Sequence, residues 1–152
     1  MSTARIVVGV DGSESSKDAL RWAKARADAD GAELVAVSAW SYPVASFPML
    51  VNEVAAPETF DVEGETRATL DSVIKETLGD VTVTRQALQG HPVTVMLAAA
   101  RHADLVVVGS RGHGGFVGSL LGSVSQGLVA HADCPVVVVR HPKQRSAEQA
   151  RD

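Results

Sequence analysis

The chain has 152 residues, of which 45% are hydrophobic and 21% charged, so we expect one globular domain large enough to bury a core. The formal net charge of −4 and the lack of a basic block argue against a general nucleic-acid partner. No apolar run approaches the roughly 20 residues that cross a bilayer, and no signal-peptide pattern is present. The one cysteine, Cys134, cannot form an internal disulfide, so we expect a cytoplasmic protein with no membrane partner.

The first half of the chain alternates strand and helix patterns. A short apolar run ends at the turn Asp11-Gly12-Ser13, where Asp11 or Ser13 can cap a helix. Gly31 is a suitable stop for that helix. In chain order we expect a strand over 6–10, a helix between the 11–13 turn and Gly31, a strand over 34–40, a proline-containing loop over 41–57 and a helix over about 58–78.

The second half repeats the alternation. Residues 81–88 alternate apolar and polar side chains, which is typical of an edge strand with one wet face. Pro92 suits the first turn of the helix that follows it. We then expect a buried strand over 105–108, a helix ending near His131, a strand over 135–139 and a polar tail. The domain is accordingly predicted over residues 1–142, with the tail over 143–152.

Three of the predicted strands are continuous apolar runs, which indicates a parallel sheet covered on both faces. We predict an α/β fold with a single open twisted five-stranded parallel sheet, strand order 3-2-1-4-5, and helices on both faces. Ligands of such sheets bind beyond the carboxyl ends of the strands, where the strand order reverses. With this order, Asp11 and the loop after residue 108 face each other across one crevice.

The loop after residue 108 carries the strongest signal for function. It reads Gly109-Ser110-Arg111-Gly112, then nine residues, then Gly122-Ser123-Val124-Ser125, and it joins a buried strand to a helix N-terminus. Glycines allow close approach of the backbone, and a helix N-terminus favours an anion, so the segment predicts phosphate binding. Arg111 is either a phosphate ligand or a solvated loop charge. Asp11 suits a ribose hydroxyl, a metal ion or a helix cap.

The common nucleotide and hydrolase fingerprints are not met. No lysine precedes Ser123, as a Walker loop would require. Val117 stands where the third glycine of a dinucleotide fingerprint would follow Gly112 and Gly114. Ser123 also occupies the first glycine position of a hydrolase elbow around Ser125.

A different pattern does match. The chain resembles the universal stress protein family over about residues 4–141. The nucleotide-binding members of that family carry G-x2-G-x9-G-[S/T], which corresponds here to Gly109, Gly112, Gly122 and Ser123. The segments 7–13 and 121–136 resemble the opening and closing blocks of the family.

The resemblance implies an ATP-binding Rossmann-like domain, with Mg²⁺ left open as a companion ion. It also implies a homodimer that pairs through the strand over 135–139. By position, Asp11 would bind the ribose and the backbone of Ala39 would meet the adenine edge. The nucleotide-binding residues carried over are Gly9, Val10, Asp11, Ala39, Gly109, Arg111, Gly112, Gly115, Gly122, Ser123, Val124 and Ser125.

The leading hypothesis is therefore an ATP-binding stress-response or signalling module that works as a homodimer with a protein partner the sequence does not name. Efficient catalysis is not expected, because no phosphate-gripping lysine and no positioned base accompany Asp11 and Arg111. Slow ATP hydrolysis or an ATP-using transferase is the second hypothesis. A cAMP-binding module and a nucleotide-independent interaction dimer remain as further alternatives.

Overall fold

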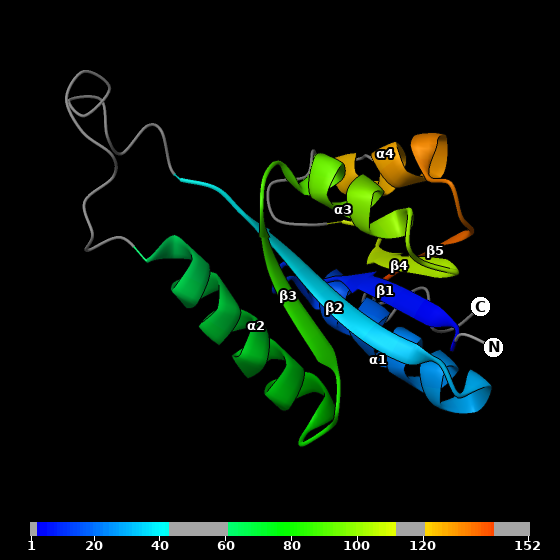
Figure 1. Ribbon diagram of the computed structural model, residues 1–152, viewed down its shortest axis with the longest axis horizontal. Helices are drawn as coiled ribbons and strands as arrows, with labels where there is room; N and C mark the ends of the chain where they lie inside the picture. Colours follow the sequence, from blue (N-terminus) through cyan, green and yellow to red (C-terminus); the bar gives the residue numbers. More distant parts are fainter. Residues whose placement is uncertain (1–2, 43–60, 112–120, 142–152) are drawn as a thin grey trace, which may run out of the picture.

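The structure is a computed structural model in which residues 3–42, 61–111 and 121–141 are described. It contains one five-stranded sheet in the order β3-β2-β1-β4-β5, and all neighbouring strands run parallel (Figure 1). This confirms the predicted fold class and strand order. The strands are β1 (Arg5–Gly9), β2 (Glu33–Trp40), β3 (Thr84–Gln89), β4 (Leu105–Gly109) and β5 (Val136–Val139).

Helices cover both faces of the sheet (Figure 1). The helices α1 (Glu14–Asp30) and α2 (Val62–Leu78) lie on one face, and α3 (Pro92–Ala100) and α4 (Ser123–His131) lie on the other. Because successive strand residues point to opposite faces, a continuous apolar run supplies both layers. The central strands show this: Val8 belongs to the buried cluster under α1 and α2, and Val7 to the cluster under α3 and α4.

The start of α1 fixes the turn that follows β1. The Ser13 side chain caps the helix by accepting a hydrogen bond from the backbone N–H of Ser16 at 3.2 Å. Of the two predicted caps, Ser13 is therefore the one used. The helix ends as predicted at Gly31, which adopts the left-handed conformation with φ 65°.

Several element boundaries differ from the sequence-based expectation. Strand β3 begins at Thr84, which pairs with Val35, and not at residue 81. The alternation of apolar and polar residues that led us to predict a strand from residue 81 does reflect burial, since Val83 is buried in the core. Helix α2 begins at Val62 because Asp61 caps it, and β5 begins one residue after Pro135.

Some predicted segments lie outside the described residues, including most of the loop over 41–57 and the tail over 143–152. Among the helices that are described, none is long and apolar enough to cross a membrane.

Candidate functional site: a pocket at the carboxyl edge

A cavity of about 730 Å³ opens at the carboxyl edge of the sheet. Its walls come from the ends of β1, β2 and β4, from the first turns of α1 and α4, and from α2 on one face of the sheet and α3 on the other. The volume lies within the range of pockets that hold small molecules and cofactors. The reversal of strand order between β1 and β4 thus produces the crevice that the topology predicts.

Ten of the twelve predicted site residues line this one cavity, although they come from four separate segments of the chain. Gly112 and Gly115 are the remaining two and lie outside the described residues. The ten lining residues are Gly9, Val10, Asp11, Ala39, Gly109, Arg111, Gly122, Ser123, Val124 and Ser125.

Asp11 sits in a turn that its own side chain holds in place. Its Oδ1 atom accepts hydrogen bonds from the backbone N–H of Ser13 at 2.9 Å and from the Ser13 hydroxyl at 2.5 Å. The Ser13 Oγ atom also lies 3.3 Å from the carbonyl oxygen of Arg111. The turn after β1 is therefore fixed beside the loop after β4, while the Oδ2 atom of Asp11 has no hydrogen-bond partner within the described residues.

Gly109 is required because α1 passes directly over it. A Cβ atom on Gly109 would lie 2.5 Å from the Oγ atom of Ser15 and 2.6 Å from the backbone carbonyl carbon of Ser15. The same Ser15 hydroxyl lies 3.4 Å from the Ser110 hydroxyl and accepts a hydrogen bond from the backbone N–H of Arg111 at 3.4 Å. The first glycine of the motif thus allows α1 to hold the start of the loop.

The N-terminus of α4 is open toward the cavity. Gly122 occupies the cap position without a side-chain hydrogen bond, and no acidic residue stands in the first turn. Ser125 is only 2% exposed, and its hydroxyl bonds to the carbonyl oxygen of Gly122 at 3.0 Å, so it fixes the turn from inside. Ser123 is exposed and lines the cavity with Val124. The first N–H groups of this helix have no intrahelical acceptor.

The other helices that reach the pocket begin differently. Helix α1 is capped by Ser13 and followed by Glu14, and α3 is capped by the His91 side chain. Helix α2 is capped by Asp61 and carries two glutamates in its first turn. Within the described part of the chain, α4 is therefore the helix whose N-terminal positive potential is not already offset by a cap or an acid.

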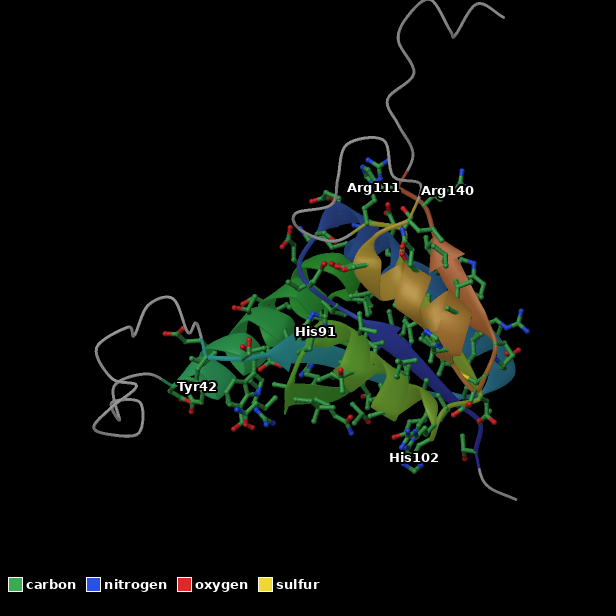
Figure 2. All side chains as sticks on the ribbon, turned by 90° about the horizontal axis from the view of Figure 1, so that it is seen from above. Tyr42, His91, His102, Arg111 and Arg140 are labelled. Carbon is green, nitrogen blue, oxygen red and sulfur yellow. The ribbon has the colours of Figure 1, made fainter. Side chains whose placement is uncertain are left out.

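The charges around the cavity are few. Arg111 is the basic residue among its described lining residues, and Figure 2 shows it at the same edge of the molecule as Arg140, with His102 at the opposite edge. Asp11 and Glu65 are the acidic lining residues. Across the ranges 3–42, 61–111 and 121–141, no group of three or more His, Cys, Asp or Glu side chains could hold a metal ion.

One wall of the cavity was not predicted from the sequence. Residues on the face of α2 line it, and Met96 of α3 closes the opposite side next to Gly9. The sequence signal is weak, because the polar residues at the start of α2 look like ordinary solvent-facing positions until the helix is placed. The lining residues of α2 are Val62, Glu65, Thr66, Thr69, Leu70 and Val73.

A match to one protein family covers nearly the whole chain. The model of the universal stress protein family matches residues 3–140. The chain belongs to this family. A universal stress protein of Mycolicibacterium smegmatis is 38% identical over 138 residues, which are 89% of this chain and 45% of the relative. The chain thus spans about half the length of the curated relatives it matches.

Solved structures of the family have the same fold. A universal stress protein in complex with cAMP is 26% identical, with a TM-score of 0.61 over 91% of this chain and 98% of that one. A family member from Arabidopsis thaliana with AMP bound is 22% identical, with a TM-score of 0.55 over 97% of this chain and 99% of that one. Both of these neighbours bind adenine nucleotides.

Proposed function

We propose that this universal stress protein domain binds ATP in the carboxyl-edge pocket and acts as a homodimeric stress-response or signalling module. The observation that carries the proposal is the open N-terminus of α4, which follows the glycine-rich loop and lines the same cavity as Asp11. A cavity that contains both an anion-binding helix end and a carboxylate is suited to a ligand that carries both phosphates and hydroxyl groups.

In this proposal the phosphates contact the first N–H groups of α4, the hydroxyl of Ser123 and the guanidinium of Arg111. The ribose hydroxyls donate to the Asp11 carboxylate oxygen that Ser13 does not occupy. The base lies toward Ala39, where Val37 and Met96 provide apolar walls. Mg²⁺, when it accompanies ATP, is held chiefly by the phosphates, since this ion is commonly bound through one or two carboxylates and substrate phosphates.

The pocket favours binding over rapid turnover. The described residues that line it include no lysine and no histidine, which are the side chains that commonly grip a phosphate or act as a general base. We therefore propose a switch in which bound nucleotide orders the loop after β4 and so alters a surface that a partner protein contacts. Slow ATP hydrolysis is compatible with the same site.

The dimer is proposed through β5. This strand forms one edge of the sheet, and all four of its residues are valines that are partly exposed. An apolar strand with an unpaired edge favours pairing with a second strand, and a two-fold axis lets it pair with its own copy.

The proposal is tested by calorimetric titration with ATP, ADP and cAMP, each with and without Mg²⁺. We expect ATP to bind and Arg111→Gln to weaken ATP binding by about tenfold, as the loss of a charged phosphate contact would. Arg140→Gln is the matched control, because Arg140 lies at the same edge but does not line the pocket. An absence of binding heat for every nucleotide would overturn the proposal.

Binding of cAMP is the second candidate, and the cAMP complex of the 26% identical family member favours it. The two candidates differ at the ribose, because the 3′ oxygen of cAMP is part of the cyclic phosphate and cannot donate to Asp11. Tighter binding of cAMP than of ATP in the same titration would select the second candidate.

A further inference from the structure

The charges that line the pocket are sorted by position. The basic side chain, Arg111, lies on the loop after β4, and the open helix N-terminus of α4 belongs to the same side of the strand reversal. The acidic side chains belong to the other side: Asp11 follows β1, and Glu65 comes from α2, which packs against β2 and β3. By strand order, Glu65 therefore lies on the far side of the cavity from α4, whereas the Asp11 turn lies beside the loop after β4, with the Ser13 Oγ atom 3.3 Å from the Arg111 carbonyl oxygen.

Glu65 is on the pocket face of its helix. The residues of α2 that line the cavity recur at the spacing of one helical face, and Glu65 lies between Val62 and Thr69 on that face. Glu63 instead pairs with Arg67 at 3.1 Å and does not line the cavity. Within the described residues, the Glu65 side chain has no hydrogen bond or ion pair, so its charge is not neutralised by a neighbour.

The helix end that carries Glu65 is closed to anions. The Asp61 side chain accepts a hydrogen bond from the N–H of Gly64 at 2.9 Å, and Gly64 leaves room for it, since a Cβ there would collide with the Asp61 carboxylate. With Glu63 and Glu65 in the same turn, three carboxylates offset the positive end of the α2 dipole. The start of α2 is therefore opposite in electrostatic character to the start of α4.

We propose that Glu65 is a specificity-determining residue that, together with Asp11, restricts the pocket to nucleotides phosphorylated at the 5′ position alone. This inference rests on the proposed nucleotide-binding function and names the ligand class of the same site. A phosphate on the ribose 2′ or 3′ oxygen would add a second anion to a cavity wall that carries the Asp11 and Glu65 carboxylates. It would also remove a ribose hydroxyl group, and with it a hydrogen bond that the Asp11 carboxylate would otherwise accept.

The strength of the repulsion between Glu65 and a ribose phosphate depends on how far the Glu65 side chain is exposed to solvent. Glu65 is a solvent-exposed residue, so water and salt screen its charge. We expect its repulsion to contribute about threefold to tenfold in discrimination at low ionic strength and less at high ionic strength. A preference for ADP that weakens at high salt indicates a charge effect, because a steric effect would not depend on salt.

The test compares ligands with the same number of phosphates. Dissociation constants are measured by calorimetry at low and high salt for ADP, adenosine 2′,5′-bisphosphate and adenosine 3′,5′-bisphosphate. We expect the wild-type chain to prefer ADP over either bisphosphate. We expect Glu65→Gln to reduce that preference about threefold or more at low salt, because the loss of the charge strengthens binding of the bisphosphates more than binding of ADP.

Glu63→Gln is the matched control, because it removes the same charge from the same helical turn but from a residue outside the pocket lining. An unchanged ADP preference in Glu65→Gln, with ADP still bound, would overturn this inference and leave the proposed function intact. Equal changes in both variants would also overturn it, since the effect would then be one of net charge. Failure of the wild-type chain to bind ADP or ATP would instead overturn the proposed function.

Discussion

At the scale of single residues, Gly109 shows how one missing side chain connects the fold to the site. We expect Gly109→Ala to lower the free energy of unfolding by about 1–3 kcal/mol, because its Cβ would overlap Ser15 and displace the first turn of α1. ATP affinity should fall with it, because Ser15 also accepts the hydrogen bond of the Arg111 backbone. Chemical denaturation and calorimetric titration measure the two effects.

The control for this variant is Gly31→Ala at the opposite end of α1. Gly31 has φ 65°, and a Cβ atom added to it would meet nothing within 4 Å. Alanine there therefore costs backbone strain of about 1–2 kcal/mol without touching the pocket. If both variants lose similar stability but only Gly109→Ala loses ATP affinity, the contact between Gly109 and Ser15 explains the loss of affinity. If both variants lose affinity equally, that explanation is contradicted.

Cys134 is the other residue with a testable physical property. Partial burial raises the pKa of its thiol above the usual 9.0, and the negative charges of Asp104 and Asp133 raise it further. Since the thiolate is the reactive form, we expect alkylation by iodoacetamide to be slower in the native protein than in the unfolded chain at about pH 8. The rate should reach half its maximum at a higher pH in the native protein than in the unfolded chain, and Asp133→Asn should shift the native midpoint downward. A native midpoint at or below that of the unfolded chain would contradict this interpretation.

At the scale of elements, the open end of α4 makes stability and binding respond in opposite directions. An acid in the first turn of a helix stabilises it, so we expect Ser123→Asp to raise the free energy of unfolding by about 0.3–1 kcal/mol. The same carboxylate would repel the phosphates, and we expect ATP affinity to fall by at least about tenfold. Ser123→Asn is the uncharged control. A gain in stability with unchanged ATP affinity would locate the phosphates elsewhere.

Strand patterns predicted the elements better than their ends. Continuous apolar runs placed β4 and β5 within one residue of their bounds. For β4 the reason is that a buried strand has few polar positions to confuse the pattern. The residues of β5 are partly exposed, but all four are valines, which favour strands. The start of β3 was missed, since Val81 and Val83 pack against the core without joining the hydrogen-bonded ladder. Both valines are thus packed against the core without being paired to a neighbouring strand, and the apolar pattern of the sequence indicates only the packing.

The site was predictable where it depends on backbone and not where it depends on helix placement. Gly109 marks a close backbone approach and Gly122 the cap of α4, and such positions leave a spacing in the sequence. Glu65 and Met96 reach the pocket through the packing of α2 and α3 on opposite faces of the sheet. No short motif encodes that packing, so these residues become visible only in three dimensions.

At the scale of the whole molecule, the pocket and the β5 edge are joined by one small network. The Ser15 hydroxyl lies 3.3 Å from the carbonyl oxygen of Val139 at the end of β5, and the backbone N–H of Ser110 donates to that same oxygen at 2.8 Å. Both serines adjoin the glycine-rich loop. Nucleotide binding that reorders the loop therefore has a direct physical route to the edge where we propose the dimer forms.

The proposed dimer can be tested at that edge without disturbing the sheet. The carbonyl oxygens of Pro135 and Val139 accept hydrogen bonds from β4, so by the alternation of a parallel strand the N–H of Val138 faces the open side. Proline is tolerated on an edge strand where the missing N–H faces outward. We therefore expect Val138→Pro to fold and to be monomeric in light scattering at concentrations where the wild-type chain is dimeric.

Two further variants separate loss of pairing from loss of folding. Val138→Ala keeps the outward N–H and should remain dimeric, which shows that the missing donor is what separates the copies. Val137→Pro removes an N–H on the side of β4 and should lower the free energy of unfolding by about 3 kcal/mol or more, because it interrupts the ladder inside the sheet. If Val138→Pro stays dimeric while remaining folded, β5 is not the interface, and the network from Ser15 to Val139 would then stabilise the loop alone.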